Sequence, residues 1–312
     1  MVETGTLLGI SIFAVSILLL IKGSDLLTDS AAKTAKIFGV SDFAIGVTIV
    51  AIGTSLPELA SASYASYIGK SSILVGDVIG SNITNIALIL GLVCIIKPLP
   101  VMHTEIYSGR LHLFILTAAS IVLILGSGLG WIAGIIFVSG YFLYLRKVVK
   151  EYRTVGAEHV PRNSLTKNII GLCIGLIAII LGARLLVNSI ISIAETLGVP
   201  EFTVSLLLMS FGTSLPEVST TITAARKGYS TMAFGSIIGS NIANILWVMG
   251  VAAIINPFNI EIQQMLPAII MMLLLAVFII RFKKSQYTIE RKEGIALVAF
   301  YSIFVLANIF LL

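Results

Sequence analysis

Stretches of about 20 apolar residues, each long enough to cross the hydrocarbon core of a bilayer, recur along the whole of this 312-residue chain. The composition agrees, because 57% of the residues are hydrophobic and only 11% are charged, whereas a soluble domain carries about 25% charged residues. We therefore predict an all-α integral membrane fold. Its ten transmembrane helices are expected at residues 6–23, 43–68, 72–96, 111–127, 130–147, 168–190, 202–225, 231–255, 265–280 and 294–312.

Two further features belong to these apolar stretches. Residues 6–23 lack the small-residue cleavage site of a signal peptide, so we expect the first stretch to be a retained span. The cysteines, Cys94 and Cys173, fall inside apolar stretches. We predict that they are small core residues rather than a disulfide or a metal-binding pair.

Positive charge is distributed unevenly among the connections between the stretches. Of the 20 Lys and Arg residues, 18 fall in alternate connections, and the exceptions are Lys70 and Arg184. Basic residues are retained on the cytoplasmic side, so we predict a multi-pass protein of the cell membrane with both termini extracellular. The net charge of +5 thus reflects topology, and we expect the lipid bilayer, not nucleic acid, as the surrounding partner.

The chain contains an internal repeat with an offset of 159 residues. Gly39–Pro98 aligns with Gly198–Pro257 without a gap, and 24 of the 60 positions are identical. Five predicted spans separate corresponding points, and because five is odd the second copy must enter the membrane upside down. We predict a first five-helix half at 1–150, a cytoplasmic link at 151–167 and an inverted second half at 168–312. Inverted repeats are recurrent in secondary transporters, whose binding site lies near the bilayer midplane.

Two glutamates, Glu58 and Glu217, lie well inside apolar spans. A charge at the bilayer centre costs roughly 2.5–3.5 kcal/mol even on a lenient scale, so each must face a partner, water or an ion. The preceding Pro57 and Pro216 lack an N–H and clash with the carbonyl four residues back, so we predict that each helix is broken near its middle. Each break would gather carboxylate, carbonyl and hydroxyl oxygens, which suit hard cations such as Ca²⁺ and Na⁺. The hydroxyls belong to Thr54, Ser55, Thr213 and Ser214.

The next span of each copy adds polar residues at helical spacing. Ser81 and Asn85 are four residues apart and share a helix face, as do Ser240 and Asn244. Such side chains often only bond helices together, but their duplication beside two glutamates and two prolines favours a cation site. The same spans carry small residues four positions apart, which let helix backbones approach closely. These are Gly76, Gly80, Gly235 and Gly239.

Other chemistry is scarce in the sequence. We find neither a nucleophile–base pair nor a catalytic metal set, so we do not expect an enzyme. There is no phosphate-binding glycine loop and no soluble domain that could hydrolyse ATP, so any transport is expected to be driven by a second ion gradient. We expect no cofactor and no obligate protein partner.

The paired blocks resemble the alpha repeats of the calcium/cation antiporter superfamily. Each copy carries Gly-Thr-Ser-Leu-Pro-Glu, at 53–58 and 212–217, followed by Gly-Ser-Asn-Ile-x-Asn, at 80–85 and 239–244. The likeness covers nearly the whole chain and is greatest to the prokaryotic sodium/calcium exchangers. It implies that the first and sixth spans slide across the other eight, so that the site opens to each side in turn.

The resemblance also implies a set of ligands. Glu58 and Glu217 would be the central cation ligands, and Ala51 and Ser210 would contribute backbone carbonyls. Further side-chain or backbone oxygens would come from Thr54, Ser55, Ser81, Thr213, Ser214 and Ser240.

Two departures from the family bear on the ions. Well-studied members carry an aspartate at one of the positions matched by Asn85 and Asn244, whereas this chain has amides at both. Two midplane carboxylates match the charge of one Ca²⁺ or two Na⁺, so the number of Na⁺ per cycle and any K⁺ dependence stay open. Asp77 is acidic where the mirror position is Ser236. It is either an additional ligand near the outer entrance or, as we favour, a solvated carboxylate.

We predict a secondary active antiporter that transports Ca²⁺ and Na⁺ in exchange for each other by alternating access. The nearest alternative is a proton/calcium exchanger of the same superfamily, which the motifs disfavour without ruling it out. A cation channel is less favoured, because it needs a continuous pore and would carry current without a counter-ion.

Overall fold

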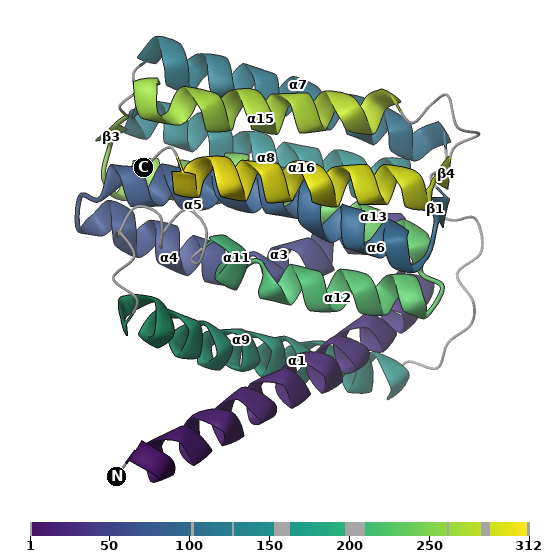
Figure 1. Cartoon of the computed structure of the whole chain (residues 1–312). Coiled ribbons are helices and arrows are strands. Elements are labelled where there is room, and N and C mark those ends of the chain that lie inside the picture. The colour runs from purple at the N-terminus through teal and green to yellow at the C-terminus, as the bar shows by residue number, and fades with distance from the viewer. Residues whose placement is uncertain are drawn as a thin grey trace.

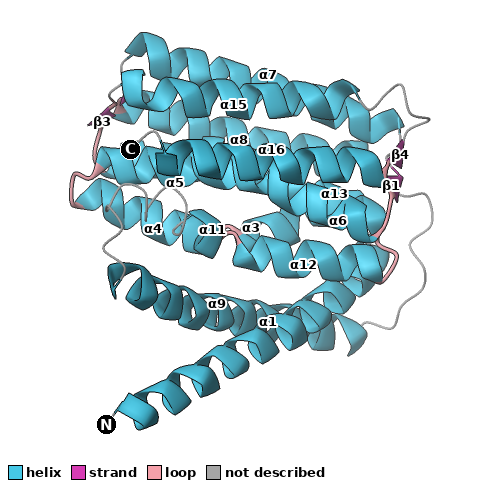
Figure 2. Ribbon diagram, in the orientation of Figure 1, coloured by secondary structure: helices cyan, strands magenta, loops and turns pink. Residues whose placement is uncertain are grey.

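The computed structural model describes residues 2–100, 103–126, 128–152, 163–196, 210–260, 262–281 and 288–310 (Figure 1). These residues are mostly helical, and the strands are two residues long (Figure 2). Elements labelled η are π-helices. The elements of the N-terminal half are α1 (Val2–Phe38), α2 (Asp42–Ile45), η1 (Gly46–Val50), α3 (Ala51–Thr54), α4 (Leu56–Tyr67), α5 (Ser71–Ile83), η2 (Thr84–Leu90), α6 (Gly91–Ile96), β1 (Leu99–Pro100), α7 (His103–Gly126), β2 (Gly128–Leu129) and α8 (Trp131–Glu151).

The C-terminal half repeats much of this order. Its elements are α9 (Asn163–Thr196), α11 (Ser210–Thr213), α12 (Leu215–Arg226), α13 (Ser230–Ile242), η4 (Ala243–Val248), α14 (Met249–Ile255), β3 (Phe258–Asn259), α15 (Ile262–Arg281), β4 (Thr288–Ile289) and α16 (Arg291–Phe310).

Several helical stretches are long and apolar enough to cross a membrane. Four do so as continuous helices, and the bent pair α2–α3 and α4 forms a fifth candidate. They agree with a multi-pass membrane protein, while the count of ten spans stays a prediction. Part of the span predicted at 202–225 lies outside the described residues. The four continuous stretches are Ser71–Ile96, Trp131–Glu151, Leu165–Gly182 and Ser230–Ile255.

Helix α1 runs further than the span predicted at 6–23. It continues because an apolar face persists beyond the charged residues, with Leu27, Ala31 and Ala35 buried. The helix ends at Phe38 and is followed by Gly39, whose φ is 60°. There the N–H of Val40 donates to the carbonyl of Ala35 at 3.1 Å, which is the hydrogen bond of a Schellman C-cap.

The helices are arranged in layers. Helices α1 and α9 lie against each other on one side of the bundle, and α7 and α15 lie together on the opposite side (Figure 1). A Cβ on Gly23 would lie 2.9 Å from the carbonyl oxygen of Gly175, so the α1–α9 contact depends on a missing side chain. In each of the stretches Ser71–Ile96 and Ser230–Ile255, 78% of an 18-residue apolar window is buried, which places them at the centre of the bundle.

Two short strand pairs, which the all-α prediction did not include, tie the halves together. β1 pairs with β4, Leu99 opposite Ile289, and β2 pairs with β3, Leu129 opposite Phe258. β1 and β3 occupy corresponding places in the repeat, yet they lie at opposite ends of the bundle (Figure 1). This arrangement is what two copies inserted in opposite directions would produce.

Close backbone contact also joins the two copies at the centre. A Cβ on Gly235 would lie 2.5 Å from the carbonyl oxygen of Phe43, and one on Gly239 would lie 2.6 Å from that of Val47. The prediction that these glycines let helices approach is confirmed. The residues that would mirror this contact for Gly76 and Gly80 lie outside the described residues.

The cysteines differ from each other. Cys94 is buried, as predicted, but Cys173 is exposed on α9. The prediction of a core position for Cys173 is wrong, because an apolar residue of a membrane helix can face lipid as readily as protein.

Candidate functional site

The helical stretch that carries each glutamate breaks at a serine. Ser55 separates α3 from α4 with φ −84° and ψ 8°, and Ser214 separates α11 from α12 with φ −82° and ψ 2°. This sparsely allowed region of backbone conformation is frequent at active sites. Pro57 and Pro216 follow in the first turn of the next helix, where a missing N–H is tolerated. At the first break the helix bends by 46°.

The breaks place both glutamates at helix N-termini. Glu58 lies in the first turn of α4 and Glu217 in the first turn of α12, where the helix dipole favours negative charge. Both side chains are buried, at 0% and 1% exposure. Acids placed this deeply require compensation by hydrogen bonds or by cations.

The two glutamates are held crosswise by the opposite copy. Ser55 Oγ donates to Glu217 Oε1 at 3.1 Å, and Ser214 Oγ donates to Glu58 Oε1 at 3.4 Å. Ser240 Oγ also donates to Glu217 Oε1, at 3.3 Å. The two predicted serine hydroxyls at the breaks therefore lie together with both carboxylates.

The second oxygen of each carboxylate is unsatisfied. Glu58 Oε2 and Glu217 Oε2 are buried and have no hydrogen-bond partner in the described part of the chain. No Lys or Arg there forms an ion pair with either glutamate. Two buried carboxylates with free lone pairs and no protein cation are suited to binding a metal cation.

Asp77 belongs to the same cluster. It is 1% exposed, and its carboxylate accepts hydrogen bonds from Ser61 Oγ at 2.5 Å and from Thr213 Oγ1 at 3.2 Å. Our interpretation of Asp77 as a solvated carboxylate is wrong. It failed because Ser61 and Thr213 come from two other helices and enclose the carboxylate, which the spacing along α5 could not reveal.

The remaining predicted hydroxyl and carbonyl oxygens form hydrogen bonds within the protein. Ser81 Oγ lies 3.5 Å from Thr213 Oγ1, and Thr54 Oγ1 donates to the carbonyl of Val50 at 3.1 Å. The carbonyl of Ala51 accepts from the N–H of Ser55 at 3.0 Å, and that of Ser210 accepts from the N–H of Ser214 at 3.2 Å. Thr54 Oγ1 and Thr213 Oγ1 also donate to these two carbonyl oxygens, at 3.5 Å and 3.3 Å.

The two asparagines are in different surroundings. Asn85 Nδ2 donates to Asn241 Oδ1 at 2.9 Å, which joins the central helices of the two copies. Asn244 is completely buried, and neither its Oδ1 nor its Nδ2 has a hydrogen-bond partner among the described residues. Both asparagines lie in π-helices, η2 and η4, which change the helical register and often mark functional positions.

Sequence reasoning missed two participants. Ser61 orients Asp77, and Asn241 connects to the other copy both through Asn85 and by donating to the carbonyl of Asn82 at 3.4 Å. Asn82 and Asn241 are identical in both copies of Gly-Ser-Asn-Ile, so the repeat did carry a signal for them. Ser61 follows Glu58 by three residues, and its spacing alone gave no reason to select it.

The donor set is typical of a hard cation. Within the described ranges, no three His, Cys, Asp or Glu side chains converge to hold a metal ion. The site instead combines carboxylate, hydroxyl, amide and carbonyl oxygens, a mixture that suits Na⁺ and Ca²⁺ rather than Zn²⁺ or Cu²⁺.

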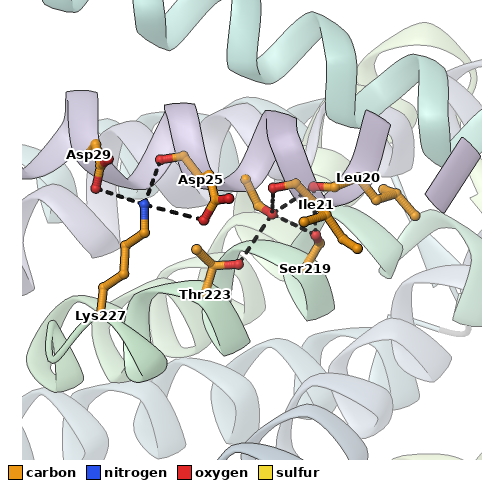
Figure 3. A network of polar contacts seen from close by, with 8 residues as sticks. Leu20, Ile21, Asp25, Asp29, Ser219, Thr223 and Lys227 are labelled. Atoms are coloured by element: carbon orange, nitrogen blue, oxygen red, sulfur yellow. Dashed lines mark hydrogen bonds and ion pairs between the residues drawn. The ribbon is translucent and has the colours of Figure 1, made fainter. Parts of the chain in front are cut away.

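A separate polar cluster joins α1 to α12 (Figure 3). Ser24 Oγ lies 2.8 Å from Ser219 Oγ and accepts a hydrogen bond from Thr223 Oγ1 at 3.2 Å. Ser219 Oγ also donates to the carbonyl of Leu20 at 2.9 Å. These contacts lie on the helix that carries Glu217, and they attach α1 to it.

Lys227, which follows the last residue of α12, makes further contacts with α1. Lys227 Nζ lies 2.8 Å from Asp29 Oδ1 and 3.3 Å from Asp25 Oδ1, and it donates to the carbonyl of Asp25 (Figure 3). Partial burial lowers the pKa of Lys227, but its hydrogen bonds with Asp29 and Asp25 outweigh that effect and raise the pKa above its usual value. The lysine is therefore held in its charged form between two acids of α1.

Comparison with known proteins gives matches along most of the chain. The model of the family "Sodium/calcium exchanger protein" matches residues 8–149 and 167–310. An uncharacterised membrane protein of Methanocaldococcus jannaschii is 36% identical over 230 residues, which are 73% of this chain and 74% of that protein. The sodium/calcium exchanger MaX1 of Methanosarcina acetivorans is 35% identical over 138 residues, which are 44% of this chain and 39% of that exchanger.

Solved structures extend the likeness to the fold. One structure of the sodium-calcium exchanger NCX_Mj, soaked with 10 mM Na⁺ and zero Ca²⁺, is similar to this chain with a TM-score of 0.85 at 35% sequence identity. The match covers 96% of this chain and 99% of that chain.

Proposed function

Because this chain belongs to the sodium/calcium exchanger protein family, we propose that it is a secondary antiporter that exchanges Na⁺ for Ca²⁺ by alternating access. One observation carries the proposal. Glu58 and Glu217 meet at two helix breaks, each carboxylate is oriented by a serine of the other copy, and each keeps one buried oxygen without a partner among the described residues.

The charge of the cluster supports a cation as the missing partner. Two unit charges about 4 Å apart interact by about 4 kcal/mol at an effective dielectric constant of 20, so Glu58 and Glu217 repel each other when the site is empty. A Ca²⁺ ion or two Na⁺ ions would neutralise both. Asp77 adds a third buried carboxylate. In the described residues it does not converge with both glutamates on one ion, so we propose that it is a ligand of a further cation bound beside them.

We propose the following ligand set around these acids. The side chains of Ser55, Ser214 and Ser240 already contact a glutamate, so small movements would turn their oxygens toward an ion. Asn244 would contribute its unpaired Oδ1. The remaining proposed ligands are Thr54, Thr213, Ser81, Asn85 and the carbonyl oxygens of Ala51 and Ser210.

The architecture that we propose follows from the repeat. Residues 1–150 and 168–312 would form two inverted five-helix halves joined by a cytoplasmic link at 151–167, with both termini outside. The ten spans would cross with the breaks at Ser55 and Ser214 near the midplane. Support comes from the crossed serine–glutamate pairs and from the strand pairs at opposite ends of the bundle (Figure 1). Helices α1 and α9 would slide past the rest and open the site alternately to each side.

Proton/calcium exchange is the second candidate. A carboxyl group can bind a proton where it would otherwise bind a metal cation, and three carboxyl groups lie buried in this cluster. Sodium coupling is favoured because MaX1 and NCX_Mj are both named as sodium/calcium exchangers.

Transport by the purified protein in reconstituted vesicles distinguishes sodium exchange from proton exchange and from a channel. The protein would be reconstituted in proteoliposomes, and ⁴⁵Ca²⁺ uptake measured with an outward Na⁺ gradient, with a pH gradient, and with neither. We expect uptake only with the Na⁺ gradient. Uptake that follows the pH gradient alone would establish the proton exchanger, and equal uptake without any gradient would indicate a channel.

A further inference from the structure

A large apolar groove opens on the side of the bundle, away from the glutamates. Its volume is about 1200 Å³, and its walls are the end of α1, the segment α2–η1 and one face of α8. Large apolar side chains in it are exposed, with Phe38 at 57%, Phe142 at 55% and Leu143 at 64%. In a membrane protein such a groove is filled by lipid chains or by another helix.

Two cations lie at one end of the groove. Arg146 and Lys150 are exposed, lie one turn apart on α8, and form no hydrogen bond or ion pair with any residue that the structure describes. Their neighbour Lys147, by contrast, lies 3.8 Å from Glu151. None of the described residues that line the groove is acidic. The groove therefore presents positive charge that no group in the described part of the chain compensates.

The length of the groove matches one leaflet of a bilayer. The α8 residues that line it run from Ser139 to Lys150, which corresponds to about 16 Å at 1.5 Å per residue. Half of a hydrocarbon core is about 15 Å thick. An acyl chain that lies along Ile49 and Phe142 would thus bring its headgroup to the level of Arg146 and Lys150.

We propose that this groove is a binding site for one anionic phospholipid, whose phosphate is bound by Arg146 and Lys150 and whose acyl chain packs along α8. Basic pockets between transmembrane helices suit anionic headgroups, and each basic residue near the surface contributes about 1 kcal/mol. An anionic phospholipid, unlike an apolar helix, supplies both the hydrocarbon and the negative charge that the described lining lacks. The proposal does not depend on which ions the protein transports.

Native mass spectrometry of the detergent-purified protein would test it. Phosphatidylglycerol and phosphatidylcholine with identical chains are titrated in turn, and we expect tighter binding of phosphatidylglycerol. The variant Arg146→Gln/Lys150→Gln should bind phosphatidylglycerol roughly tenfold to thirtyfold more weakly, from two contributions of about 1 kcal/mol each. Its matched control is Lys97→Gln/Lys292→Gln, which removes the same charge from exposed positions outside the groove.

The headgroup site and the acyl-chain site can be disproved separately. Unchanged binding in Arg146→Gln/Lys150→Gln, or an equal loss in the control, would rule out a specific headgroup site. Val149→Trp should fill the groove and weaken binding of both lipids, whereas Ile132→Trp, on the same helix outside the groove, should not. If Val149→Trp binds both lipids normally, or if glycerol phosphate without acyl chains binds as tightly as phosphatidylglycerol, the acyl-chain site is wrong.

Discussion

Ser55 donates a hydrogen bond of 3.1 Å to Oε1 of Glu217, a residue 162 positions further along the chain. Ser214, its counterpart in the second copy, donates to Oε1 of Glu58 at 3.4 Å. Each glutamate is therefore oriented by the helix break of the opposite copy, and neither copy holds a complete site alone. Reciprocal contacts of this kind are what the inverted repeat that we propose would place at a transporter's binding site.

We expect Glu58→Gln and Glu217→Gln each to abolish calcium exchange while the protein still folds. The amide has nearly the shape of the carboxylate and can still accept the serine hydrogen bond, but half of the glutamate charge is lost. A unit charge about 4 Å from the ion contributes on the order of 4 kcal/mol at an effective dielectric constant of 20, so affinity should fall more than ~100-fold. Calcium uptake in proteoliposomes measures the effect.

The matched control for both variants is Glu293→Gln. Glu293 lies in the first turn of α16, where its half-buried side chain accepts from the N–H of Glu290 at 2.8 Å. This change should leave uptake unaltered. Parent-level uptake by either Glu58→Gln or Glu217→Gln, at equal expression, would disprove the proposed site.

The role of Asp77 is tested by Asp77→Asn. The amide can accept from Ser61 or Thr213 but carries no charge, so exchange should fall severalfold and the dependence on Na⁺ concentration should become less steep. Ser236→Ala, at the mirror position, is the control, since Ser236 Oγ is buried without a hydrogen-bond partner in the described residues. If both variants exchange calcium like the parent, Asp77 is a structural residue and not a ligand.

Much of the site could be predicted because the repeat doubles every signal. Glu58 and Glu217 stand in identical blocks with prolines beside them, so depth in the membrane, helix breakage and charge all indicate the same place. The family predicted from these motifs is confirmed. The helix breaks also occur beside the prolines, at Ser55 and Ser214.

The errors concern residues whose surroundings come from other helices. Burial of Asp77 depends on Ser61 and Thr213, and exposure of Cys173 depends on which face of α9 meets a neighbour. Hydropathy does not distinguish a lipid-facing position from a buried one, since both are apolar. The π-helical segment that holds Asn85 is equally invisible in the sequence, because it changes the hydrogen-bond register without a change in composition.

The orientation in the membrane is tested by cysteine labelling. In a background with Cys94→Ala and Cys173→Ala, Lys150→Cys should react with an impermeant maleimide only from the cytoplasmic side, and Lys70→Cys only from outside. Lys284→Cys, which lies outside the described residues, should behave like Lys150→Cys. Labelling of the Lys70 and Lys150 positions from the same face would contradict the inverted repeat.

The proposed sliding of α1 is tested by tying it to α12. Ser24 Oγ and Ser219 Oγ are 2.8 Å apart, so cysteines at both positions can approach the S–S distance of about 2.05 Å after small adjustments. In the background without Cys94 and Cys173, oxidation of Ser24→Cys/Ser219→Cys should stop calcium exchange, and a reductant should restore it. The two single variants are the controls. Full exchange by the cross-linked protein would show that α1 does not move against α12.

The ion pairs of Lys227 should contribute little to stability, and that contribution should not depend on pH near neutrality. Lys227 bridges Asp25 and Asp29, whose side chains are 43% and 46% exposed, and exposed pairs contribute about 0.2–1 kcal/mol. Because the pKa of Lys227 is raised in the folded protein, the contribution is fully present below the ordinary lysine pKa of about 10.4 and is lost only as pH rises through the raised value.

We therefore expect Lys227→Met to lower the melting temperature slightly and equally at pH 6 and pH 9, with the difference from the parent vanishing at strongly alkaline pH. Lys292→Met, which changes an exposed lysine of α16, gives the baseline. A difference between parent and Lys227→Met that disappears between pH 6 and pH 9 would mean that the charged lysine is not what attaches α1 to α12.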